Sequence, residues 1–150
     1  VVRRRVRKLH ARVVSEGRAV APSSPPEVLH ELRKTCKKLR YVLEVFADVF
    51  PAKDHAKAVK ALRALQRVLG AFQDREVQAD VLTDLAEALL DEQEAETGTM
   101  LALGALVDDL RRQQQAARDA FPSTFAQFDR EKVAERFARL AGAAPEHRCG

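Results

Sequence analysis

The sequence has few of the residues on which many binding and catalytic sites depend. It contains no Trp, one Tyr, one Met and two cysteines, Cys36 and Cys149. Two cysteines without a CxxC pair provide neither a zinc site nor a disulfide framework. We expect Cys36 to be a buried thiol on the apolar side of its helix, and a reducing cytoplasm suits both cysteines.

Long apolar runs and phosphate-binding loops are also missing. No stretch of about 18 uncharged apolar residues is present to span a membrane. The basic start, VVRRRVRKLH, lacks the apolar segment of a secretory signal. The phosphate-loop patterns GxxxxGK[ST] and GxGxxG do not occur. The first residue is not Met, which suggests a piece of a longer protein.

What the sequence has in excess is positive charge near its start. The net charge is +4 over 150 residues, a length typical of one domain. Residues 1–41 carry 12 Lys and Arg against 3 Asp and Glu, a net of +9. The remaining residues carry 14 against 19, a net of −5. This asymmetry suggests that the basic part meets a polyanion or an acidic partner.

Apolar residues recur with a period near 3.6, which predicts an all-α protein, an antiparallel helical bundle of the four-helix type. The domain is expected to cover residues 1–140, followed by a disordered tail at 141–150. Ser24 to Glu27 resemble a capping box, and Asp129 is a candidate N-cap. The six expected helices cover about 2–17, 25–50, 53–72, 74–95, 99–119 and 128–140.

Residues 30–41, HELRKTCKKLRY, gather basic side chains along one helix. The apolar stripe of that helix consists of Leu29, Leu32, Cys36, Leu39, Leu43, Phe46 and Phe50. Away from it lie His30, Lys34, Lys37, Lys38 and Tyr41, flanked by Arg33 and Arg40. Like charges at i, i+3 and i+4 repel by roughly 0.2–0.5 kcal/mol per pair. An external anion would relieve this repulsion.

Two other expected helices repeat the pattern. The third carries Lys53, Lys57, Lys60, Arg63 and Arg67 on one side, and the first carries Arg4, Arg7 and Lys8. If the three helices are neighbours, their basic residues can line one groove. Arginine forks, lysine point charges, a cationic histidine and a tyrosine hydroxyl suit an extended chain of phosphates. With so few aromatic residues, base stacking is poorly provided for, so nucleic acid is less favoured.

Enzyme chemistry finds little support, so neither a catalytic residue nor a cofactor is predicted. Hydrolysis of polyphosphate usually needs a metal ion held by carboxylates, and the basic faces offer only Glu31 and Glu44. His10, His55 and His147 lack metal-ligand spacing and are expected at the surface or its boundary. The acidic residues at 91–96 are interpreted as a solvated helix end, not a metal site.

The basic helix also resembles a known family. Residues 30–44 read HxLRKxxKxLRYxxE, and Leu65, Gln66, Leu69, Gly70 and Asp74 follow about 20 residues later. This pair of motifs resembles the CHAD family, the conserved histidine α-helical domain, over residues 1–140. The resemblance implies two related four-helix bundles around a basic cavity that binds inorganic polyphosphate. This chain resembles the second, C-terminal bundle.

The resemblance also implies partners and a location. An N-terminal CHAD repeat in the full-length protein, or a second copy, would complete the cavity. A CYTH-type domain is a further expected partner within the full-length protein. The expected location is the cytoplasm, including polyphosphate granules, with no membrane partner. The alternative is a helical interaction or scaffold domain whose same basic face docks acidic protein partners or nucleic acid.

By position, the resemblance assigns the cavity lining to His30, Arg33, Lys34, Lys37, Arg40 and Tyr41, with Lys38 near its edge. Helical periodicity extends the binding set to Arg4, Lys8 and Lys60. Gln66, Gly70 and Asp74 form the second, structural motif. Within it, Gln66 is expected to hold backbone or a basic residue, and Asp74 to cap the fourth helix.

Overall fold

The computed structural model describes residues 1–142, and every regular element in that range is helical. The chain divides into two compact units, one made of residues 1–67 with the segment from 123 onward and one made of residues 68–122. The all-α bundle prediction is confirmed. The elements are α1 (Val2–Ala19), α2 (Pro26–Val45), the 3-10 helix η1 (Ala47–Val49), α3 (Ala52–Asp91), α4 (Thr97–Phe128) and α5 (Glu131–Leu140).

Within residues 1–142, five α-helices replace the six expected ones: the expected third and fourth helices form one helix, α3, and the expected fifth helix extends past Pro122 to Phe128. Helix α3 continues through Gly70, where a helix-interior glycine costs only about 1 kcal/mol. Burial of the neighbouring Leu69 and Phe72 offsets that cost. Pro122 likewise lies inside α4, between the buried Phe121 and Phe125. In both places, packing outweighs the local signal to end a helix.

Three predicted caps are also wrong. The N-cap of α2 is Pro25, and the Ser24 hydroxyl instead accepts a hydrogen bond from the Ala21 N–H. The N-cap of α5 is Arg130, while Asp129 forms an ion pair with Arg18. Asp74 lies in the interior of α3, where no helix begins.

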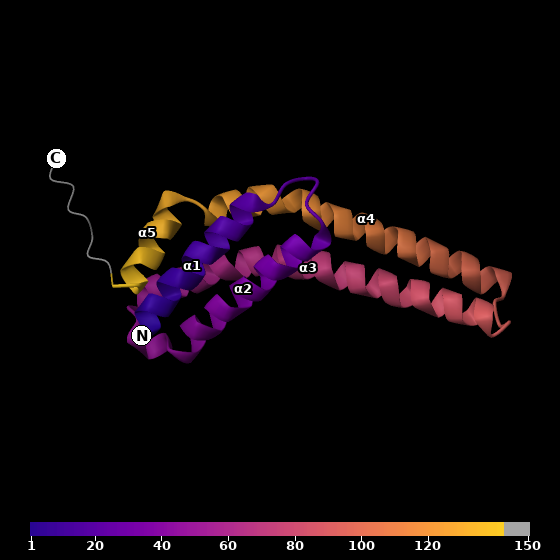
Figure 1. The fold of residues 1–150 in the computed structure, drawn as a ribbon, viewed down its shortest axis with the longest axis horizontal. Helices are drawn as coiled ribbons and strands as arrows, with labels where there is room; N and C mark the ends of the chain where they lie inside the picture. The colour runs from indigo at the N-terminus through magenta and orange to yellow at the C-terminus, as the bar shows by residue number, and fades with distance from the viewer. Residues whose placement is uncertain (143–150) are drawn as a thin grey trace. The chain divides into compact units, whose positions relative to one another are not determined.

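In the first unit, α1 packs against both α2 and α5 (Figure 1). The apolar stripe of α2 is buried as far as Leu43, and Phe50 is buried beyond η1, whereas Phe46 is exposed. Cys36 is fully buried, as expected, and burial raises the pKa of its thiol to about 12. The core of this unit also contains Val6, Leu9 and Val13 from α1, and Val133, Phe137 and Leu140 from α5.

The second unit consists of the C-terminal part of α3 and most of α4. Arg111 of α4 lies 2.6 Å from the Asp80 carboxylate of α3, and the Arg118 guanidinium lies 5.9 Å from the centre of the Phe72 ring. Within residues 1–142, every helix is too short or too polar to be a membrane-spanning segment. The tail expected to be disordered lies, from residue 143, outside the described residues.

Candidate functional site

The buried side of α2 fixes which way its basic residues point. Thr35 is almost completely buried, and its hydroxyl donates a hydrogen bond of 2.8 Å to the Glu16 carboxylate of α1. Helix α1 therefore lies on the Thr35 side of α2. Because each residue turns a helix by about 100°, Lys37, two positions later, points to nearly the opposite side.

On the side toward α1, acidic residues partly compensate the basic ones. Lys34 and Glu31 form an ion pair of 2.8 Å, and Arg12 and Glu16 form another of 2.5 Å. The hydrogen bond and charge of Lys34, with smaller effects of Arg12 and Lys38, lower the pKa of Glu31. By contrast, Lys37 is exposed and makes no ion pair or hydrogen bond within residues 1–142.

On the side toward α3, Arg40 is held in one orientation. One terminal nitrogen donates a hydrogen bond of 3.2 Å to the side-chain oxygen of Gln66, the contact with a basic residue that the sequence predicts for Gln66. The Arg40 guanidinium also lies 5.4 Å from the centre of the Tyr41 ring. Its Nε is 3.5 Å from Glu44, whose carboxylate lies 3.3 Å from Arg63. Arg40 is therefore fixed between two helices.

The structure places the remaining motif residues of α2 along the same exposed arc. His30 and Arg33 are half-buried, whereas Lys34, Lys38 and Tyr41 are exposed. These side chains extend over about three helical turns.

The residues added from periodicity are less well placed. Arg4 and Lys8 are exposed on α1, the helix that lies on the Thr35 side of α2. They therefore do not share a side with Lys37 and Arg40. Lys60 is exposed on α3, one turn before Arg63, at the outer edge of the α2–α3 contact. That Arg4, Lys8 and Lys60 line one groove with α2 stays a prediction.

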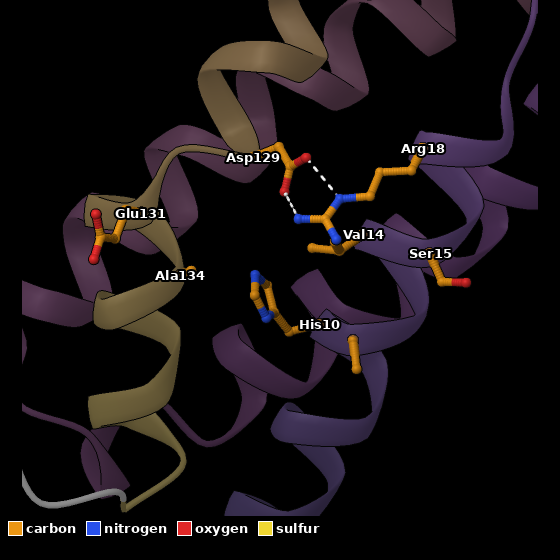
Figure 2. Close-up of a pocket in the computed structure, with 8 residues that line it drawn as sticks. His10, Val14, Ser15, Arg18, Asp129, Glu131 and Ala134 are labelled. Atoms are coloured by element: carbon orange, nitrogen blue, oxygen red, sulfur yellow. Dashed lines mark hydrogen bonds and ion pairs between the residues drawn. The ribbon is translucent and has the colours of Figure 1, made fainter.

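A separate open pocket of about 660 Å³ lies among α1, the end of α4 and the start of α5 (Figure 2). At its rim, Arg18 donates two hydrogen bonds, of 2.8 and 2.9 Å, to the Asp129 carboxylate. His10 lines the pocket, stacks on Phe137 at 4.3 Å, and has its pKa lowered to about 4 by burial. None of the predicted binding residues lines this pocket.

The sequence does not reveal this pocket, because Arg18 and Asp129 are 111 positions apart. The expectation that His10 and His55 lie at the surface or its boundary is confirmed, since both are half-buried. His147 is outside the described residues. Among residues 1–142, no group of three or more His, Cys, Asp or Glu side chains is arranged to hold a metal ion.

The fold and the site define an all-α protein with an exposed basic face on α2, at the edge of which Arg40 donates a hydrogen bond to Gln66 of α3. The chain belongs to the CHAD domain family, whose family model matches residues 1–83. The matched segment contains α1, α2 and α3 up to Thr83, and so includes both sequence motifs. A comparison with curated proteins found no match.

Proposed function

We propose that the chain binds inorganic polyphosphate, without turning it over, through the exposed side of α2. The observation that carries the proposal is the charge of residues 30–41, which include five Lys and Arg against one Glu. Membership of the CHAD family, which is associated with polyphosphate binding, supports it. The side chains that would contact the polymer are His30, Arg33, Lys34, Lys37, Arg40 and Tyr41, with Lys38 at the edge.

The electrostatics of α2 favour an anion that follows the helix. Lys37 has no carboxylate partner within residues 1–142, so a phosphate would provide a counter-charge that the described fold does not. Arg40 is already oriented by Gln66, so binding would require little loss of side-chain freedom. A partner that bears carboxylates could also neutralise these positive charges. A linear polyphosphate, however, presents its negative charges at regular, closely spaced intervals.

The proposal excludes turnover because the face offers no recognisable means of hydrolysis. Phosphoanhydride cleavage commonly uses a metal ion held by several carboxylates. Glu31 and Glu44 are the acidic side chains nearest the basic face, and both already form ion pairs with cations. We therefore expect bound polyphosphate to keep its chain length, which gel electrophoresis of the recovered polymer would check.

The direct test is a titration with long-chain polyphosphate at several salt concentrations, using Lys34→Glu/Lys37→Glu against the original chain. If each lost charge-assisted contact contributes roughly 1.5–3 kcal/mol, the double variant should bind at least about 100-fold more weakly. By analogy with single-stranded nucleic acid, two lost phosphate contacts should lower the salt slope by about 1.4.

The matched control is Arg130→Glu/Lys132→Glu, which makes the same change in net charge at the exposed start of α5. Circular dichroism should show that both double variants remain helical. Equal loss of affinity in both would mean that binding depends on net charge and not on α2. Duplex DNA that competes as well as polyphosphate, at equal phosphate concentration, would favour the interaction-domain alternative.

A further inference from the structure

The two compact units of the chain have opposite charge. In residues 68–122, 4 Lys and Arg stand against 12 Asp and Glu, a net of −8. In residues 1–67 and 123–142, 21 Lys and Arg stand against 9 Asp and Glu, a net of +12. Opposite charges of this size attract a second molecule of the same kind over distances near the Debye length of about 10 Å.

The acidic unit also exposes an unusual row of apolar side chains on α3. Val77, Val81 and Leu85 follow one another at intervals of four residues, which places them along one side of the helix. They are 52%, 58% and 45% exposed, respectively. The buried side of the same helix segment contains Phe72 and Ala79. We call the three exposed residues the outer stripe. The exposed Asp84 lies beside it.

The basic unit exposes a complementary surface at the C-terminal end of α2. This end patch consists of Tyr41, Val45, Phe46 and Val49, of which Val45 is the most exposed at 74%. Lys34 and Lys38 lie on the same side of α2 as Tyr41 and Val45, because all four fall within about 60° on the helix. One side of α2 is thus basic at Lys34 and Lys38 and apolar toward the C-terminal end of the helix.

We propose that the outer stripe of one copy binds the end patch of a second copy. Both surfaces combine exposed apolar side chains with charged neighbours, and the charges are of opposite sign. A second outer stripe is a poorer occupant, since two units of net charge −8 would repel.

An antiparallel arrangement of the two helices matches the two surfaces along their length. With Val45 of one copy beside Val77 of the other, Tyr41 lies beside Val81. Lys38 then lies beside Asp84. The antiparallel direction also brings opposite ends of the two helix dipoles together.

The size of the contact determines how strong the association can be. The stripe extends over about 12 Å, since eight residues of helix rise 1.5 Å each. A contact along a 12 Å length of helix buries less area than the roughly 1,200 Å² of total surface buried in stable complexes. The association should therefore be weak and reversible. Because the two surfaces differ and each copy has one of each, the contact between two copies is heterologous.

The experiment is sedimentation equilibrium of the chain, without polyphosphate, from micromolar to millimolar concentration at low and high salt. We expect the average mass to rise with concentration at low salt and to fall back at high salt. Val81→Lys should weaken association by about tenfold. The matched control Ala105→Lys adds the same charge at an exposed position of α4 and should change it little.

A charge exchange identifies the partner surface. Asp84→Lys and Lys38→Glu should each weaken self-association, whereas a mixture of the two variants should recover it, because each supplies the complement of the other. A chain that stays monomeric throughout, or a Val81→Lys variant that associates normally, overturns the proposal. So does a mixture that associates no better than its components. Since no polyphosphate is present, these outcomes do not depend on the function proposed above.

Discussion

Replacing Gly17 with alanine should destabilise the protein, although alanine is the better helix former. Gly17 is buried near the end of α1, where the chain approaches the aromatic ring of Phe125. A Cβ atom at this position would lie 2.0, 2.4 and 2.7 Å from three carbon atoms of that ring. All three distances are shorter than real Cβ contacts, so either α1 or the ring must move.

The size of the effect follows from two opposing contributions. The gain in helix propensity is at most about 1 kcal/mol, and less this close to a helix end. Overpacking of a core costs about 1–3 kcal/mol and occasionally more. The Phe125 ring has little freedom to move away, since it is buried and stacked on the Phe128 ring, with 6.4 Å between the two ring centres. We expect a net loss of about 2 kcal/mol, or a fall in Tm of roughly 4–8 °C.

Gly104 provides the matched control, because a Cβ built there meets no atom within 4 Å. Gly104→Ala in the exposed part of α4 should therefore raise the free energy of unfolding by about 0.5–1 kcal/mol. Urea titrations followed by circular dichroism measure both variants. A Gly17→Ala variant as stable as the original chain would show that the α1–Phe125 contact yields easily, and would refute the reasoning.

Two further predictions concern buried groups of the first unit. Burial lowers the pKa of His10 to about 4 from 6.5, so the folded state binds this proton less well than the unfolded state. The contribution of neutral, buried His10 to the free energy of unfolding is complete above about pH 6.5 and decreases by roughly 3 kcal/mol toward pH 4. The free energy of urea unfolding should therefore depend less on pH in His10→Phe. An identical pH dependence in both chains would contradict this. The second prediction concerns Cys36 in a Cys149→Ser variant. Because Cys36 is buried, its thiol should not react with a disulfide reagent until urea unfolds the chain. Rapid reaction of the native chain would show that α2 opens readily.

The sequence predicted best what depends on residues close together in the chain. The apolar stripe of α2, including the buried Cys36, follows directly from helical periodicity. A contact of Gln66 with backbone or a basic residue was expected from the motif, and the structure identifies the partner as Arg40. The continuation of α3 through Gly70 was not predicted, because the burial that stabilises it involves tertiary packing.

The side of α2 that faces α1 was beyond reach of the sequence for the same reason. The contact between Thr35 and Glu16 determines it, and no local pattern identifies these residues as partners. Without that contact, the basic residues of α1 seemed free to join those of α2. The pairing of Arg18 with Asp129, which replaced the predicted cap of α5, likewise depends on distant parts of the chain.

The hydrogen bond between Gln66 and Arg40 has an electrostatic consequence. An aspartate or glutamate would hold a guanidinium more tightly, but it would also cancel its charge. The amide oxygen of Gln66 accepts a hydrogen bond of 3.2 Å from Arg40 and adds no second negative charge to that of Glu44, whose carboxylate lies 3.5 Å from the Arg40 Nε. Rigidity and positive potential are thus obtained together at this position. Exchanging Gln66 for Glu would keep the geometry of Arg40 and weaken the field that an approaching anion meets.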